Sequence, residues 1–442
     1  MRSTFQGSLY VSLFLSSYLV GSAWAVGSYH AGDGSEDNPF QILMPADLMQ
    51  LSQHPEDYDK HFILLADIDM DPDIPGNQRF TQAVIAPNNS AAETFSGTPF
   101  SGTFDGSGYK IQNLTFEDPM YSFLGLFGRI SEEGTVINLG VENVTFRDYH
   151  FDNILVGFFA GENNGTLIQC HAAGQRRLGE WYEPYYRPMY IGGLVGRNSG
   201  FIFDCYSKGQ IIGGQYAGGL VGHNQGGYIN HCYSACSITD CMDYIGGLVG
   251  RNEGSSVISY SYAVGSIQNS FGWVGGLVGY NQNHGVDQKA VINRCYASGS
   301  VEYGNGFVGE VDDFTVIKNC YSVGAAGYYG FMGDYNRRYT EIINCFWDTQ
   351  AGGTTSSYGA VGLTTQQMKQ RQTFLDVGWD FDSTWDMIEG RTYPSFQWQE
   401  DPLENLCKDS RPFPVGDLNS DCTVDLNDFS LFVLHWMDDI RR

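Results

Sequence analysis

A five-residue motif, Gly-Gly-Leu-Val-Gly, occurs four times in the middle of this 442-residue chain, each time followed by a polar pair. Steps of 26, 28 and 29 residues separate the leucines of the four copies, and weaker copies on both sides bring the total to about eight units. A repeat of this length is one supersecondary unit that cannot bury its apolar face alone, so the units must stack. The four copies lie at residues 192–196, 218–222, 246–250 and 275–279, and the weaker ones at 126–128, 159–161, 307–309 and 331–333.

Each copy is followed by a second strand-like segment with the pattern Ile-x-x-Cys-Tyr, in which serine replaces cysteine once. Two short β segments per unit are too few for a propeller blade, and the unit lacks the leucine and aspartate signatures of leucine-rich and calcium β-roll repeats. We therefore predict an all-β chain, a right-handed parallel β-helix whose rungs stack about 4.8 Å apart. Like residues should form ladders, with Leu194, Leu220, Leu248 and Leu277 in register.

The stack needs protected ends, and two short amphipathic segments can supply them. Residues 45–51 predict a helix at the N-terminal end, and residues 364–375 predict one at the C-terminal end, where Thr364 and Gln367 have capping-box spacing. Residues 61–68 and 102–116 read as strands of irregular first rungs. The predicted organisation is a signal peptide (1–25), an N-terminal cap with irregular rungs (26–125), the solenoid (126–350), a C-terminal cap (351–398), a linker (399–416) and a calcium-binding segment (417–442).

The N-terminus has the features of a secretory signal peptide: Arg2, an apolar run over residues 9–20, and Ala23-Trp24-Ala25. We expect a secreted or cell-surface protein, with no membrane-spanning segment in the mature chain. A formal charge of −26 with only 24 Lys and Arg argues against nucleic acid, anionic lipid or polyanionic sugar as the main partner. Neutral glycans and cations remain open.

The repeats resemble those of bacterial GLUG-motif proteins. The likeness rests on the Gly-Leu-hydrophobic-Gly runs with the following Cys-Tyr-Ser, on the opening segment 62–69, and on the closing Phe346-Trp347-Asp348 and Tyr393-Pro394, and it covers roughly residues 28–398. The resemblance implies a β-helical surface or secreted protein, sometimes attached to adhesins or peptidases. It brings no catalytic residues.

A calcium loop is the sharpest chemical motif in the sequence. Calcium takes six to eight oxygen ligands, and an EF-hand loop supplies them from positions 1, 3, 5, 7, 9 and 12. Apolar residues at 429, 432, 433 and 436 then share one face of a following helix. In this chain those positions are Asp417, Asn419, Asp421, the Thr423 carbonyl, Asp425 and Asp428.

This segment also resembles one half of a type I dockerin, which implies Ca²⁺ as a cofactor and a cohesin-like partner. Only one copy is present, and Cys422 stands where a glycine usually makes the turn, so the expectation of cohesin binding is the weaker one. A non-glycine residue at positive φ is strained. A disulfide from Cys422 to Cys407, the nearest unassigned cysteine, could sustain it.

The remaining cysteines mostly follow the repeat and predict a ladder of small buried residues, rather than a zinc site. Cys236 and Cys241 are candidates for a disulfide across a loop. The tyrosines after the ladder cysteines form a second series, and we expect them to be buried, unless a bend before each cysteine turns them outward. The cysteine ladder is Cys170, Cys205, Cys232, Cys295, Cys320 and Cys345, and the tyrosines are Tyr206, Tyr233, Tyr262, Tyr296 and Tyr321.

No serine-hydrolase, zinc-protease or phosphate-loop motif is present in the sequence, so catalytic residues are unknown. Acidic pairs such as Asp312 and Asp313 could act as glycosidase carboxylates, and the acidic run from Asp67 to Asp73 reads as a solvated strand exit rather than a cation site. We expect a non-catalytic scaffold or adhesin that binds an extracellular glycan or cell-surface protein. The alternative is an enzyme that cleaves O-glycosidic bonds of polysaccharide, a glycoside hydrolase or lyase, by analogy with other β-helices.

Calcium should fold the C-terminal segment without holding the solenoid together. Without the ion, four carboxylates within twelve residues repel one another, and so short a segment has too little apolar area to offset its ordering entropy. Limited proteolysis with and without chelator should show cleavage after residue 398 only when calcium is removed. Equal cleavage in both conditions, or no effect of Asp417→Ala with Asp428→Ala, would contradict the assignment.

Overall fold

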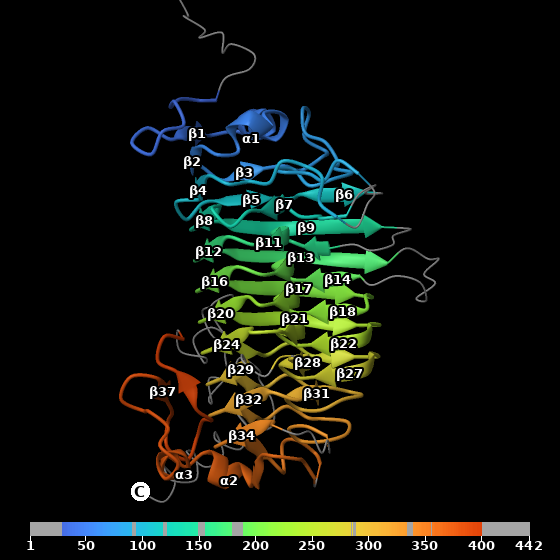
Figure 1. The fold of residues 1–442 in the computed structure, drawn as a ribbon, viewed down its shortest axis with the longest axis vertical. Helices are drawn as coiled ribbons and strands as arrows, with labels where there is room; N and C mark the ends of the chain where they lie inside the picture. The colour runs from blue at the N-terminus through green and yellow to red at the C-terminus, as the bar shows by residue number, and fades with distance from the viewer. Residues whose placement is uncertain are drawn as a thin grey trace, which may run out of the picture.

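The computed structural model describes residues 29–90, 94–117, 122–148, 155–178, 189–283, 285, 289–333, 339–354 and 356–399. Over these residues the chain winds into one long coil of parallel strands, with β1 (Phe40–Ile42) at one end and β34 (Glu341–Ile343) near the other (Figure 1). The predicted signal peptide, nearly all of the linker and the calcium-binding segment lie outside the described residues. The predicted parallel solenoid is confirmed.

Each of the five central rungs visits four sheets in a fixed order, which we name sheets A, B, D and C. One rung runs from β8 in sheet A through β9 in sheet B and β10 in sheet D to β11 in sheet C, before β12 pairs with β8. Every strand pair in the four sheets is parallel, whereas β37 (Trp385–Asp386) and β38 (Ser395–Phe396) pair antiparallel. Adjacent rungs therefore place equivalent residues side by side.

The strands of the four sheets, in spatial order, are as follows. Sheet A comprises β1 (Phe40–Ile42), β2 (His61–Leu64), β4 (Thr103–Asp105), β8 (Thr135–Ile137), β12 (Thr166–Ile168), β16 (Phe201–Phe203), β20 (Tyr228–Asn230), β24 (Val257–Ser259), β29 (Ala290–Asn293), β32 (Thr315–Lys318) and β34 (Glu341–Ile343). Sheet B comprises β3 (Ile68–Asp69), β5 (Lys110–Gln112), β9 (Gly140–Asp148), β13 (His171–Leu178), β17 (Tyr206–Ile212), β21 (Tyr233–Thr239), β25 (Tyr262–Ala263), β30 (Tyr296–Ala297), β33 (Tyr321–Ser322), β35 (Phe346–Asp348) and β36 (Val361–Leu363), with β6 (Thr115–Glu117) beside β9 and β26 (Ile267–Gln268) beside β21. Sheet C comprises β7 (Phe127–Ile130), β11 (Ala160–Asn163), β15 (Val195–Asn198), β19 (Val221–Gln225), β23 (Val249–Glu253), β28 (Val278–Gln282) and β31 (Val308–Val311), and sheet D comprises β10 (Leu155–Gly157), β14 (Tyr190–Gly192), β18 (Tyr216–Gly218), β22 (Met242–Gly246) and β27 (Phe271–Gly275). The remaining elements are α1 (Pro45–Gln53), η1 (Pro55–Asp57), α2 (Thr365–Met368), α3 (Arg371–Leu375), β37 (Trp385–Asp386) and β38 (Ser395–Phe396).

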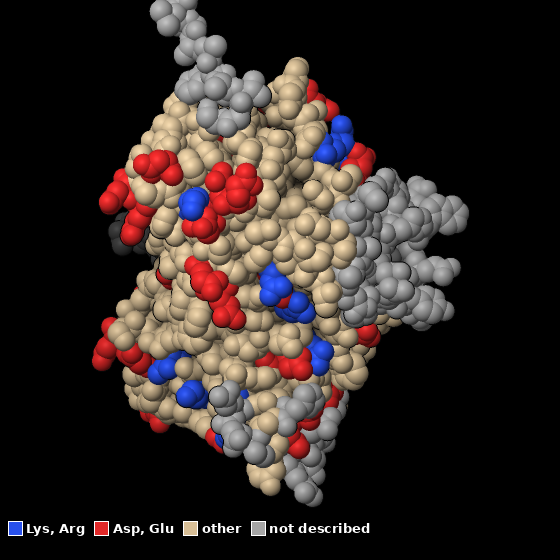
Figure 2. Space-filling model, turned by 45° about the horizontal axis from the view of Figure 1, so that its top comes forward, with Lys and Arg blue, Asp and Glu red and all other residues tan. Residues whose placement is uncertain are grey.

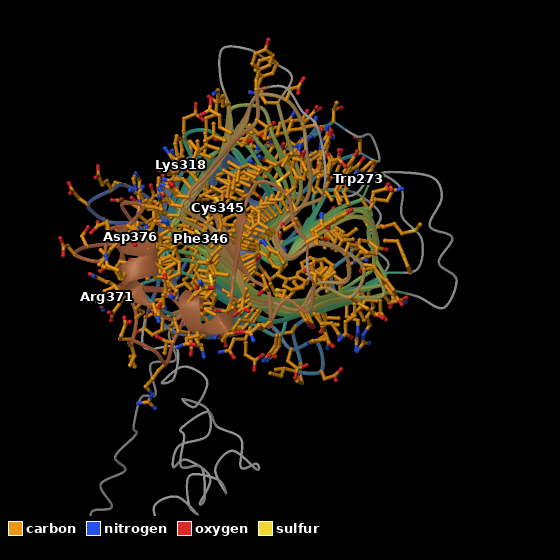
Figure 3. All side chains as sticks on the ribbon, turned by 90° about the horizontal axis from the view of Figure 1, so that it is seen from below. Trp273, Lys318, Cys345, Phe346, Arg371 and Asp376 are labelled. Carbon is orange, nitrogen blue, oxygen red and sulfur yellow. The ribbon has the colours of Figure 1, made fainter. Side chains whose placement is uncertain are left out.

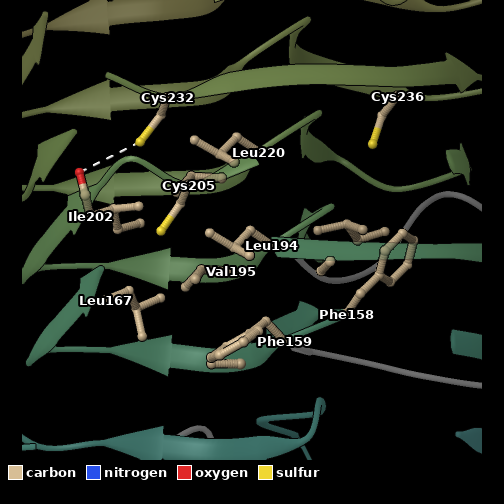
Figure 4. Close-up of a cluster of buried hydrophobic side chains, with 14 of the residues drawn as sticks. Phe158, Phe159, Leu167, Leu194, Val195, Ile202, Cys205, Leu220, Cys232 and Cys236 are labelled. Atoms are coloured by element: carbon tan, nitrogen blue, oxygen red, sulfur yellow. Dashed lines mark hydrogen bonds between the residues drawn. The ribbon is translucent and has the colours of Figure 1, made fainter. Parts of the chain in front are cut away.

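The repeat leucines form the predicted ladder inside the coil. The backbone N–H of Leu194 donates to the carbonyl of Leu220 at 2.9 Å, Leu220 donates to Leu248 at 2.8 Å, and Leu248 to Leu277 at 2.9 Å. All four side chains are fully buried, and Figure 4 shows Leu194 and Leu220 one above the other beside Cys205 and Cys232. The prediction that these leucines stack in register is confirmed.

Close approach between rungs explains the glycine pair of each motif. A Cβ added to Gly193 would lie 2.1 Å from the carbonyl oxygen of Gly219, and the same contact joins Gly219 to Gly247. These glycines bend the chain between sheets D and C without entering the left-handed region of φ. Glycine is needed here because a side chain would push the rungs apart.

A bend separates sheet A from sheet B in every repeat. The residue before each ladder cysteine, such as Asp204, His231 or Asn319, has φ between 51° and 54°. The predicted continuous strand from isoleucine to tyrosine is therefore wrong: β16 ends at Phe203, the chain turns at Asp204, and β17 begins at Tyr206. A single left-handed residue reverses which face the following side chain occupies.

A ladder of asparagines runs through sheet C. Each side-chain Nδ2 donates to the Oδ1 of the next asparagine at 2.7–2.8 Å, and all five side chains are fully buried. The ladder ends where Ile130 and Val311 occupy the position, and its two terminal atoms, Oδ1 of the first member and Nδ2 of the last, have no partner among the described residues. The members are Asn163, Asn198, Asn224, Asn252 and Asn281.

The two caps differ in their placement. Helix α1 closes the N-terminal end as predicted, because Leu48 and Leu51 are fully buried in the solenoid core. At the C-terminal end the capping box of Thr364 and Gln367 is confirmed, with the Thr364 N–H donating to Gln367 Oε1 at 2.9 Å. The predicted lid is wrong, however: the segment from Met368 onward packs on the outside of sheet B in a second, separate apolar cluster.

Asn224→Ala should destabilise the solenoid by about 3 kcal/mol, because it leaves Asn252 Oδ1 without its donor and breaks the bond from Asn198. Asn281→Ala is the matched control. It removes a side chain whose Nδ2 already has no partner in the described structure, so we expect a cost smaller by about 1 kcal/mol or more. Urea unfolding measures both, and equal costs would contradict a continuous ladder.

Candidate binding faces

The cysteine ladder is structural. All six side chains are buried, and each thiol donates to the carbonyl oxygen two residues earlier at 3.1–3.4 Å, thereby pairing a carbonyl beside the left-handed bend. Ser261 takes the place of cysteine in one rung and donates to Ser259 O at 2.7 Å. The predicted ladder of small buried residues is confirmed.

The proposed disulfide between Cys236 and Cys241 is not formed in the structure. Cys236 lies within β21, Cys241 follows the turn at Asp240, and both are free and buried. Burial raises the pKa of Cys236 to about 11 and that of Cys241 to about 12, so both are unreactive thiols at neutral pH. The other pair, Cys407 and Cys422, lies outside the described residues.

The repeat tyrosines face outward from the solenoid core, contrary to the expectation of burial in it. Their rings stack face to face along sheet B with centroids 4.8–5.0 Å apart, and His171 continues the stack above Tyr206 at 4.7 Å. The bend before each cysteine is the cause, since it places cysteine inside and tyrosine outside.

The lower half of this tyrosine ladder is nevertheless buried, by the C-terminal segment. Tyr262, Tyr296 and Tyr321 pack against a cluster that includes Trp379 and Trp385, and the Tyr321 hydroxyl donates to Pro394 O. Tyr206 and Tyr233 are only half-buried. Only the part of the ladder around Tyr206 and Tyr233 thus leaves tyrosine rings partly open to solvent.

A second aromatic ladder runs along sheet D, and sequence reasoning missed it. Tyr190, Tyr216, Tyr244 and Trp273 stack with centroids 4.6–5.1 Å apart. The signal was present, because each of these residues stands two positions before the first glycine of its Gly-Gly-Leu-Val-Gly copy. Stacking covers the ring faces of the middle members, which leaves their edges toward solvent.

The sheet D ladder ends in a patch of exposed aromatic side chains, which we call the aromatic patch. Its five members are 37–55% exposed and come from three adjacent rungs, with Phe271 stacked on Tyr303 at 5.2 Å. Trp273 lies on the side of the coil opposite α3, which begins at Arg371 and is followed by Asp376 (Figure 3). The patch comprises Phe271, Trp273, Tyr303, Tyr328 and Tyr329.

Charged side chains line sheet C beside the sheet D ladder. His223 Nε2 lies 2.9 Å from Glu253 Oε2, and an Arg251 guanidinium nitrogen lies 3.2 Å from the same oxygen. Arg251 also stacks over the Tyr244 ring at 5.6 Å. These contacts fix the positions of the charged side chains on sheet C, and Arg251 helps to hold the Tyr244 ring in place.

The acidic residues singled out in the sequence serve as local hydrogen-bond acceptors. Asp69 Oδ1 accepts from the Asp71 N–H, and Asp71 Oδ1 accepts from the Asp73 N–H, both at 2.9 Å. Asp312 Oδ1 accepts from the Asp313 N–H at 2.8 Å, and its other oxygen accepts from the Tyr280 hydroxyl at 3.2 Å. Within the described ranges, no three metal-ligating side chains come together.

Fold and faces define a parallel β-solenoid with aromatic ladders on its outside. Within that class, residues 244–268 and 274–302 match the GLUG motif, so the chain carries GLUG repeats. It is 28% identical over 429 residues to a protein of Evansella cellulosilytica provisionally named a Gly-rich membrane protein, covering 85% of this chain and 47% of the relative. It is 29% identical over 150 residues to halomucin of Haloquadratum walsbyi, covering 34% of this chain and 2% of that protein.

The chain thus spans about half the length of the first of these relatives and a small part of the second. Two solved structures are similar at low TM-scores. One, from Bacteroides ovatus, is provisionally named an immunoglobulin A1 protease (TM-score 0.41, 19% identity, 84% of this chain and 96% of that one). The other is named IgA1 protease (TM-score 0.46, 17% identity, 83% of this chain and 26% of that one). In the part of the chain that the structure covers, no helix has the length and apolarity to cross a membrane.

His223 should make the solenoid sensitive to acid. Burial lowers the pKa of His223, and the hydrogen bond that its ring makes to the Glu253 carboxylate opposes this only in part, so the folded state favours the neutral ring. The unfolded chain takes up this proton near about pH 6.5, so the contribution to stability is full above that pH and is lost as the pH falls below it.

Urea midpoints measured at pH 7.5 and pH 5.5 should differ less in His223→Gln than in the parent chain. The matched control is His54→Gln, at an exposed position beside Glu56 near the N-terminal cap. An unchanged pH slope in His223→Gln would refute the assignment.

Proposed function

We propose that this protein is a secreted, non-catalytic β-solenoid scaffold that binds an extracellular glycan through the aromatic patch. The single observation that carries the proposal is the gathering of five exposed aromatic side chains on three adjacent rungs. Exposed apolar side chains gathered in one region of a surface often mark a binding site.

The chemistry of the patch suits a sugar. The C–H faces of a pyranose ring are apolar and its rim carries hydroxyls, which matches aromatic faces bordered by polar groups. The phenol groups of Tyr303, Tyr328 and Tyr329 can donate and accept hydrogen bonds at the edge of the patch. Successive rungs repeat these groups at about 4.8 Å, which favours an extended, repetitive ligand over a compact one.

We also propose that the protein is exported and that its C-terminal segment binds calcium. The signal peptide expected at residues 1–25 would export the chain, and the calcium loop at Asp417–Asp428 would form a separate module after the solenoid. A cohesin-like partner for that module remains the weaker part of the proposal. The resemblance to GLUG proteins supports a surface or secreted location.

Cleavage of the bound glycan is the alternative function. One observation favours it: Asp312 contacts Tyr280, whose ring lies 5.9 Å from that of Trp273, so a carboxylate lies near the patch. A glycosidase needs two carboxylates on either side of the bond. Release of reducing ends from bound glycan, abolished in Asp312→Asn, would support the enzyme.

Trp273→Ala and Tyr303→Ala should each weaken binding to neutral oligosaccharides by about tenfold or more, because each removes an exposed stacking surface. A panel of cello-, xylo-, manno- and malto-oligosaccharides tested by calorimetry identifies the ligand. Phe201→Ala is the matched control, since Phe201 is 51% exposed on sheet A, away from the patch. Equal losses in all three variants, or no neutral glycan bound, would overturn the proposal.

A further inference from the structure

A groove of about 680 Å³ crosses the outside of sheet B near the N-terminal end of the solenoid. Its floor is formed by β9, β13 and β17, and the loop at residues 71–79 forms one wall. Close packing of backbone makes the floor flat: a Cβ on Gly209, at φ +124°, would lie 1.9 Å from the carbonyl oxygen of Gly174. The groove is separate from the aromatic patch on sheet D.

A row of polar side chains runs through the groove along the solenoid axis. Thr115, Thr145, Gln175 and Gln210 occupy equivalent positions in successive strands and all line the groove. Hydroxyl and amide groups spaced by one rung, about 4.8 Å, can exchange hydrogen bonds with an extended chain of hydroxyls.

Two cations flank this row on opposite sides. Arg147 stands two residues beyond Thr145 in β9, and Lys208 two residues before Gln210 in β17. Neither has a carboxylate within ion-pair distance among the residues the structure describes, and Lys208 instead lies 5.1 Å above the Tyr206 ring. The third groove cation, Arg79, is already balanced by Asp73 at 3.3 Å and Glu117 at 3.1 Å.

Cations with no ion pair to a described carboxylate are unexpected in a chain with 50 acidic and 24 basic residues. Among the charged side chains on the visible face in Figure 2, acidic ones are more prominent than basic ones. The basic ones occur singly or in small groups rather than as a continuous basic surface. Two isolated charges are too few for nucleic acid, whose binding depends on many phosphate contacts. They fit a ligand that carries a negative charge only at intervals.

We propose that this groove is a second binding site, for an acidic oligosaccharide whose hydroxyls bond the threonine and glutamine row and whose anionic groups pair with Arg147 and Lys208. The half-buried rings of His171, Tyr206 and Tyr233 extend the site toward the C-terminal segment. This refines the expectation from net charge, which excluded polyanionic sugars as the main partner: a local anion site exists on an acidic protein.

Oligogalacturonate of about six residues is the test ligand, and its fully methyl-esterified form is the matched neutral probe. Calorimetry in chelator, which removes calcium from both sugar and protein, should show binding of the acid form at least tenfold tighter than the ester. A sulfated oligosaccharide in parallel tells whether carboxylate or sulfate is preferred, and binding of either supports the site.

Lys208→Gln and Arg147→Gln should each weaken binding of the acidic oligosaccharide about tenfold and reduce its salt dependence. Lys289→Gln is the control, because Lys289 is paired with Glu341 elsewhere, and should bind as the parent does. Equal binding of acid and ester, or unchanged affinity in both groove variants, would overturn the inference. Equal binding of poly-glutamate would reassign the groove to acidic peptides, and Trp273→Ala should leave groove binding intact, which keeps this test separate from that of the aromatic patch.

Discussion

The in-register contact between successive rungs is the constraint on which the rest of this molecule depends. The rungs approach so closely at the Gly-Gly pairs that no side chain fits between them: a Cβ added to Gly193 would lie 2.1 Å from the carbonyl oxygen of Gly219. Once the backbones are held at this spacing, every column of side chains becomes a ladder: leucine and cysteine inside, asparagine in sheet C, and aromatic rings outside. Offset-stacked aromatic pairs are worth about 0.5–1.5 kcal/mol beyond the burial of their area, so the outer ladders also add stability.

The sequence allowed the solenoid to be predicted because its information lies in periodicity. The spacing of Leu194, Leu220 and Leu248 predicts a stack of rungs without any knowledge of the sheets. Capping residues such as Thr364 and Gln367 are local signals and were equally readable. Both depend only on residues near each other in the chain or at a fixed period.

The direction of the tyrosine ladder could not be predicted for a physical reason. Side chains alternate between the two faces of a strand only while the strand is unbroken. One left-handed residue, such as Asp204 or His231, reverses the face on which the following side chains lie. The path of the C-terminal segment was hidden as well, since Trp385 and Phe396 contact tyrosines many residues earlier in the chain. The groove at Lys208 depends on a distant loop and on which cations lack partners, so it too needed coordinates.

The asparagine ladder makes the length of the solenoid adjustable. All its amides donate in the same direction, from Asn163 toward Asn281, so the array is polar and has one unpaired oxygen at one end and one unpaired N–H at the other. Duplicating a whole unit between Asn198 and Asn224 would add a donor and an acceptor together and create no new unpaired atom. The free-energy cost of the unpaired atoms at the two ends is therefore independent of the length of the ladder, while each added unit contributes its own hydrogen bond. Gain or loss of whole repeats in the gene can therefore lengthen or shorten the outer faces of such a chain. The same rung structure can then contact ligands of different lengths.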